Sequence, residues 1–144
     1  NIGAGKYDRA KQTLRYAMMI AIGFGLVVSI LIQFIAAPVV GLFTADTAVI
    51  LLGAQYIRGY IWDCIFAGVH FSFSGYFCAC GKSGISFLHN LIAILCVRIP
   101  GVYLTSKIFP HTLFPMGLAT ATGSLLSVII CIIAYRWLCE KSGK

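Results

Sequence analysis

The chain has 144 residues, of which 60% are hydrophobic and 10% are charged, and its formal net charge is +7. Soluble domains contain ~45–50% apolar and ~25% charged residues, so this composition excludes an ordinary soluble domain, a disordered chain and a coiled coil. The six cysteines lie mostly in apolar runs, which excludes a secreted disulfide scaffold. The basic residues are scattered, which argues against nucleic acid as a partner. An all-α integral membrane protein in contact with the lipid bilayer remains.

Four charge-poor segments follow one another along the chain. Each is long enough for a transmembrane helix, which needs ~20 mostly apolar residues. After a cytoplasmic loop at 1–14, we predict four helices, at about 15–37, 48–80, 84–106 and 114–138. The chain is therefore expected to be a single unit with four transmembrane helices and no separate soluble domain.

Turn and capping residues agree with these limits. Pro38 is expected to end the first helix, and Asp46 or Thr47 to cap the second. A helix over 48–80 would be ~50 Å long, which exceeds the ~30 Å hydrocarbon core. We therefore expect it to project from the membrane or to break near Arg58 and Gly59. Pro100 should kink the third helix, because it removes one backbone hydrogen bond.

Lysine and arginine predict the orientation. In a four-helix topology, one side of the membrane holds eight basic residues, Lys6, Arg9, Lys11, Arg15, Lys82, Arg136, Lys141 and Lys144. The opposite side holds Lys107, with Arg58 near its interface. The positive-inside rule then places both ends of the chain in the cytoplasm. We therefore expect a multi-pass protein of the cell membrane.

Several short motifs resemble one transporter family in order and spacing. Asn-Ile-Gly-Ala-Gly-Lys at 1–6 is followed by Ala10, Leu-Phe-Thr at 42–44 by Asp46, and Tyr-Ile-Arg stands at 56–58. Gly-Tyr-Phe at 75–77 precedes Gly-Lys at 81–82, and Arg-Ile-Pro stands at 98–100. Together they resemble the C-terminal part, helices nine to twelve of twelve, of a multidrug and toxic compound extrusion (MATE) transporter.

This resemblance implies a secondary antiporter of which the chain is a piece. Such a protein exports small organic, often cationic, compounds in exchange for H⁺ or Na⁺, uses no cofactor and is not an enzyme. Its partners would be the remaining helices of the parent transporter. Sodium-coupled members are expected to carry the acid of helix ten near Ala67 rather than at Asp63, so the coupling ion stays open.

Asp63 is the first candidate for an ion or substrate pathway. A carboxylate within a membrane helix is costly and is normally buried against protein or water. Steps of three and four residues place it on a polar stripe of the predicted second helix, with Tyr56, Tyr60, Ala67, His70 and Ser74. This stripe indicates either a cavity that holds a flat cation or interhelical packing with local hydrogen bonds.

Arg98 is the second candidate. It lies on the next, antiparallel helix, in the same outer half of the membrane, so we predict an Asp63–Arg98 ion pair. Gly59 and Pro100 stand beside the two charges and are the hinge candidates. No residue pattern indicates a catalytic site or a metal site.

Two other functions remain open. A lipid-linked precursor flippase of the same superfamily would need cationic cavity residues for a pyrophosphate lipid, for which only Arg98 is a candidate. A non-transporting four-span scaffold would need none of Asp63, Arg98 and His70 within its helices.

Overall fold

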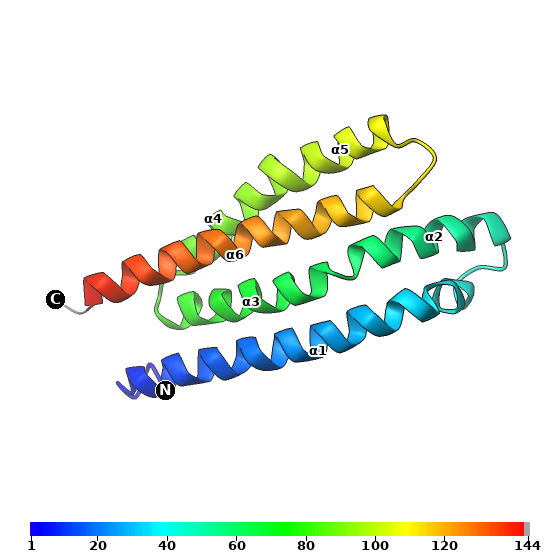
Figure 1. Ribbon diagram of the computed structural model, residues 1–144. Helices are drawn as coiled ribbons and strands as arrows, with labels where there is room; N and C mark the ends of the chain where they lie inside the picture. Colours follow the sequence, from blue (N-terminus) through cyan, green and yellow to red (C-terminus); the bar gives the residue numbers. More distant parts are fainter. Residues whose placement is uncertain (143–144) are drawn as a thin grey trace.

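The computed structural model describes the backbone of residues 1–142 and the side chains as far as Cys139. The secondary structure of this part of the chain is helical, and it contains no strand. Its elements are α1 (Tyr7–Gly41), α2 (Thr47–Tyr60), α3 (Asp63–Ala79), α4 (Ser83–Ala93), the π-helical segment η1 (Ile94–Arg98), α5 (Ile99–Ile108) and α6 (Phe114–Ser142). The helices run lengthwise beside one another, and both termini lie at the end that holds the α3–α4 turn (Figure 1).

The first helix is longer than predicted at both ends. It begins at Tyr7 instead of near residue 15, so most of the expected loop at 1–14 is helical. Ala10 and Leu14, one turn apart, are both buried, and Leu14 packs in the main hydrophobic cluster. Pro38 lies inside α1 and does not end it. The helix closes only where the backbone N–H of Phe43 donates to Val40.

The second predicted helix is two helices. α2 ends at Tyr60 and α3 begins at Asp63, close to the expected break near Arg58 and Gly59. Asp46 caps α2 as predicted, because its carboxylate accepts from the N–H of Ala48 at 2.8 Å. Three helical stretches of the described chain are long and apolar enough to cross a membrane: Tyr7–Gly41, Ser83–Ile108 and Phe114–Cys139. The predicted count of four is not confirmed, because α2 and α3 are each too short alone.

The third predicted helix is continuous from α4 through η1 to α5. A π-helical turn at Ile94–Arg98 lies just before Pro100, and the kink expected at the proline stays a prediction. Pro100 itself stands in the first turn of α5, where a missing N–H is tolerated. A π-helical turn contains one more residue than an α-helical turn, so it rotates the side chains on either side relative to each other.

The helix α6 packs against α2, α3 and the α4–α5 segment, and α1 covers the other face of α2 and α3. The buried residues of α6 include a series of small ones: Gly117, Ala119, Ala121, Gly123, Ser124 and Ser127. Gly59 and Gly117 bring two backbones into contact, because a methyl group on Gly117 would lie 2.7 Å from the backbone nitrogen of Tyr60. Such close approach is typical of small residues in membrane helices.

The segments that carry most of the basic residues meet at one end of the helical bundle. α1 begins, α3 turns into α4, and α6 finishes at one end of the bundle (Figure 1). Lys6, Arg9, Lys82 and Arg136 belong to these segments. Lys107 lies near the opposite end, where α5 leads into α6. The side chain of Lys141 and the whole of Lys144 lie outside the described residues.

Candidate functional site

The break between α2 and α3 is held by polar side chains of α1. The Ser29 hydroxyl donates to the backbone carbonyl of Ile61 at 3.2 Å. The Gln33 side-chain amide donates to the carbonyl of Arg58 at 3.1 Å. A broken helix frees backbone groups that must find other partners inside a membrane. These two side chains supply such partners, and they fix the break at Ile61 and Trp62.

The break places Asp63 at the first position of α3, where it is 5% exposed. The Arg98 guanidinium faces it, and one nitrogen lies 3.3 Å from each carboxylate oxygen. The same nitrogen donates to the hydroxyl of Ser124 at 2.5 Å. The predicted Asp63–Arg98 ion pair is therefore present, and Ser124 of α6 extends it to a third helix.

Two local features bring Arg98 to Asp63. Arg98 is the last residue of η1, so its direction depends on the π-helical turn. Its side chain then crosses α6 directly over Gly123, where an added methyl group would lie 2.5 Å from Cγ and 3.2 Å from Nε of Arg98. The side chain of Arg98 remains 30% exposed, against 7% for that of Asp63. Asp63 is thus the enclosed partner, and Arg98 is the one that remains accessible.

The face of Arg98 that is left open borders a hollow. This hollow has a volume of about 530 Å³ and is lined by Arg98, Ile99, Val102, Tyr103 and Ser106. Its lining is mostly apolar, and Arg98, Tyr103 and Ser106 are the lining residues with polar side-chain groups. A small organic molecule in this hollow would lie next to the ion pair.

Tyr56 and Tyr60 lie on the α2 side of the break. Their rings are stacked, with centroids 5.7 Å apart and an interplanar angle of 12°. Tyr60 is 37% exposed. Stacked, accessible aromatic rings beside a carboxylate attract flat cations, because the ring face is electron-rich.

His70 and Ser74 are further along α3, and both contact α4. The imidazoles of His70 and His89 meet edge to face, with centroids 5.6 Å apart. One turn closer to the α3–α4 turn, the hydroxyls of Ser74 and Ser86 share a hydrogen bond. The predicted stripe is therefore divided, since Tyr56 and Tyr60 lie beyond the break and these two residues pair across the α3–α4 interface. Ala67 is partly buried between the two groups.

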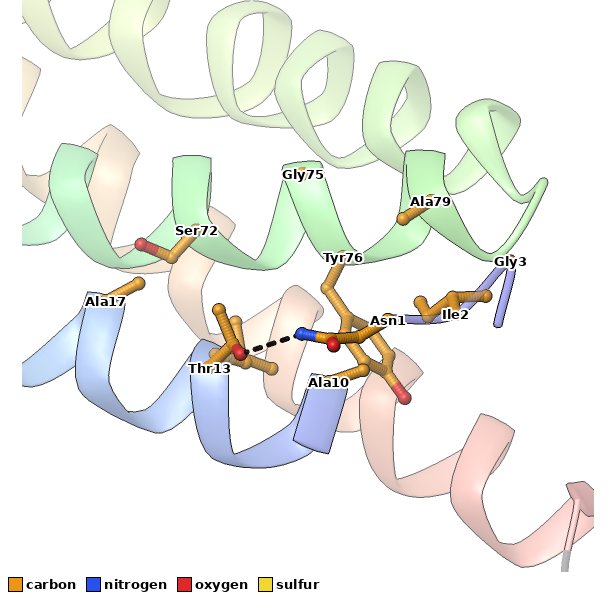
Figure 2. Close-up of a pocket in the computed structure, with 11 residues that line it drawn as sticks. Asn1, Ile2, Gly3, Ala10, Thr13, Ala17, Ser72, Gly75, Tyr76 and Ala79 are labelled. Carbon is orange, nitrogen blue, oxygen red and sulfur yellow. Dashed lines mark hydrogen bonds between the residues drawn. The ribbon is translucent and has the colours of Figure 1, made fainter. Parts of the chain in front are cut away.

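A separate hollow lies at the end of the bundle that holds the termini. It has a volume of about 400 Å³ and its lining residues include Ala10, Thr13, Ser72 and Gly75. Figure 2 shows residues 1–3 folded along it between α1 and α3, with the side-chain amide of Asn1 directed at Thr13. None of the residues that line it has a charged side chain, and its nearest lining residue on α3, Ser72, is about two and a half turns from Asp63. It is not part of the ion-pair site.

The hinge candidates occupy different surroundings. Gly59 is buried inside α2 and packs against Gly117, two residues before the break. Pro100 is exposed and follows the π-helical turn. The positions agree with the places where the helices become irregular, and a hinge role for either residue stays a prediction.

Sequence reasoning missed five polar residues of this region: Ser29, Gln33, Ser86, His89 and Ser124. A signal for two of them was present. Ser86 and His89 stand four and seven residues beyond Lys82, and Ser74 and His70 stand seven and eleven residues before Gly81, so a serine and a histidine lie about one turn apart on each side of the turn. Antiparallel helices joined by a tight turn place such residues opposite each other. Ser29, Gln33 and Ser124 lie in long apolar segments, and no spacing in the sequence shows which helix they face.

The family model MatE matches residues 1–104, a segment that contains Asp63 and Arg98 as well as the motifs near the beginning of the chain. Comparisons with curated proteins and with solved structures find no match. The matched segment covers well over half of the chain, and the whole of α6 lies beyond it. With its long apolar helices, the chain is a multi-pass membrane protein, and it belongs to the MatE family of membrane transporters.

Proposed function

We propose that the chain forms the C-terminal part of a secondary antiporter, which exports organic, often cationic, compounds in exchange for H⁺ or Na⁺. The observation that carries this proposal is the enclosed carboxylate of Asp63, paired with Arg98 at a helix break. Ionisable groups within membrane helices mark ion and substrate pathways, and broken helices are common where transporters bind their ions.

In this proposal Asp63 exchanges partners during the transport cycle. With Arg98 in contact, the carboxylate is neutralised by the guanidinium. When the pair opens, Asp63 becomes free to bind a cation or a proton. Arg98 is suited to leave, because its side chain is the more exposed of the two and borders an open hollow. Tyr56 and Tyr60 would receive a flat organic cation beside the carboxylate.

The same contacts argue against a lipid-linked precursor flippase. A pyrophosphate lipid requires unpaired cations in the cavity, whereas Arg98 is held by Asp63 and Ser124. A scaffold with no transport role would gain nothing from an enclosed ion pair, which is at best weakly stabilising compared with apolar packing.

For the orientation, we propose that the end with the termini and Lys82 faces the cytoplasm of a cell membrane. The basic segments gather at this end (Figure 1). Single cysteines introduced at 109–112, between α5 and α6, should then react with an impermeant thiol reagent in intact cells. Labelling that requires permeabilised cells would refute this orientation.

The transport proposal is tested in the complete transporter that contains this chain, with ethidium as a flat cationic probe. Asp63→Asn should reach the membrane and fail to export ethidium against its gradient, because no carboxylate remains to take up the coupling ion. Asp46→Asn is a matched control, since it also removes one acid but keeps a good cap for α2. An Asp63→Asn variant that is abundant and exports ethidium like the wild type would refute a coupling role for Asp63.

A further inference from the structure

A line of polar pairs crosses the interface between α3 and the α4–α5 segment. It starts at the α3–α4 turn with Ser74 and Ser86, continues with His70 and His89, and reaches Asp63 and Arg98. His70 precedes Ser74 by one turn, and Asp63 precedes His70 by two turns, or ~10 Å at ~1.5 Å per residue. We call these three pairs the polar seam.

The middle pair of the polar seam, His70 and His89, is buried and has unsatisfied hydrogen-bonding groups. His70 is 2% exposed and His89 is 1% exposed. Nδ1 of His70 and both ring nitrogens of His89 are buried and have no hydrogen-bond partner among the described residues. Buried polar groups normally have partners, and a site that needed only packing would be filled by apolar side chains at lower cost. The two imidazoles therefore have unused capacity to bind something small.

The distance between the two rings indicates which small species could bind there. Two imidazoles joined by an N–H···N hydrogen bond of about 2.9 Å have their ring centroids roughly 5 Å apart. The centroids of His70 and His89 are 5.6 Å apart, with the rings at 71° to each other. A small rotation about the side-chain bonds would therefore bring one nitrogen of each ring into line.

We propose that His70 and His89 form a proton-binding pair, in which one added proton is shared between the two rings. The shared proton makes one ring a donor and the other an acceptor, and so it satisfies nitrogens that lack partners in the neutral pair. A second proton would place two positive charges within one small enclosed space, so the pair takes up only one. The inference rests on the proposed transport function, for which it names the proton as coupling ion.

The charged and titratable groups around His70 and His89 determine how a proton on this pair affects the Asp63–Arg98 ion pair. The charged groups of the polar seam are Asp63 on α3 and Arg98 at the end of η1. On α6, the Ser127 hydroxyl donates to the backbone carbonyl of His89, and the next titratable group along that helix is the buried thiol of Cys131, one turn further on. The helix α1 has no charged residue between Arg15 and Asp46.

A proton on the pair therefore adds a positive charge to an interface whose other cation is Arg98. Like charges repel across a low-dielectric interior, so a bound proton and a nearby Arg98 disfavour each other. Movement of Arg98 toward Asp63 would expel the proton, and movement away would admit it. Ser74 and Ser86 offer hydroxyl groups between the pair and the α3–α4 turn.

The test is solid-state NMR of the full-length protein in lipid bilayers, with ¹⁵N-labelled histidine and signals assigned by substitution. In the wild type, His70 and His89 should change protonation together, and one proton should enter per pair. His89→Asn should remove the cross-ring coupling and shift the midpoint of His70 by more than about one pH unit. His89→Phe provides a second variant that keeps the interface packed if the polar replacement does not fold.

His111→Asn is the matched control, because it removes an exposed imidazole in the α5–α6 loop and should leave the signals of the pair unchanged. Independent titration of the two rings, or a His70 midpoint that neither His89 variant moves, would overturn the inference. Binding of Zn²⁺ in place of the shared proton would overturn it as well.

Transport measurements separate this inference from the proposed function. His89→Phe should abolish proton-driven accumulation of ethidium but keep its downhill flux. If the pair does not share a proton while export still depends on Asp63, only the present inference fails. If the pair shares a proton in a protein that moves no organic cation, only the proposed function fails.

Discussion

Removal of Arg98 should destabilise the protein more than removal of Asp63. In Arg98→Gln, a carboxylate that is 5% exposed loses its only ion-pair partner among the described residues. Breaking a buried pair in this way costs about 3–5 kcal/mol, because an uncompensated charge stays enclosed. In a chain of this size such a loss lowers Tm by roughly 10 °C or more.

Asp63→Asn should have a smaller effect. The guanidinium that remains has a side chain that is 30% exposed, and it keeps its hydrogen bond to Ser124. The loss is then nearer to that of a single charged hydrogen bond, about 1.5–3 kcal/mol. The double variant should recover much of the loss of Arg98→Gln, since neither charge remains enclosed.

The assay measures membrane abundance and apparent Tm of the wild type, both single variants and the double variant in the same detergent. Asp46→Asn again serves as the control for loss of one acid. Equal damage from the two single variants would refute the unequal enclosure of the pair. A double variant no better than Arg98→Gln alone would show that the two charges do not act on each other.

Three further predictions concern packing, the helix break and the helix cap. Gly117→Ala should destabilise by about 1–3 kcal/mol, because its methyl group meets the backbone of α2, whereas Gly75→Ala, which meets no atom within 4 Å, should not lower Tm. Ser29→Ala should cost about 0.5–1.5 kcal/mol and speed hydrogen exchange at the break, since the carbonyl of Ile61 loses a donor; unchanged exchange there would contradict this role. Asp46→Ala should cost about 1 kcal/mol in thermal unfolding through loss of the α2 cap, and a neutral effect would show that the cap does not limit stability.

The class of protein, the order of its helices and one long-range contact could be predicted from the amino-acid sequence. The distribution of charge marked the apolar segments, because charged side chains are excluded from long membrane helices. The same scarcity predicted the pairing of Asp63 with Arg98, since few other charges are available within these segments and both lie at similar depth on adjacent helices.

The end of α2, the full length of each helix and the contacts between polar groups depend on how the helices pack. The break at Ile61 and Trp62 depends on hydrogen bonds from Ser29 and Gln33, more than twenty residues earlier in the chain. In apolar segments, helical periodicity does not indicate which side faces lipid and which faces protein, because both are apolar. The contacts of Ser124 and the enclosure of His70 with His89 therefore follow from the packing of α3, α4 and α6 and not from any local pattern.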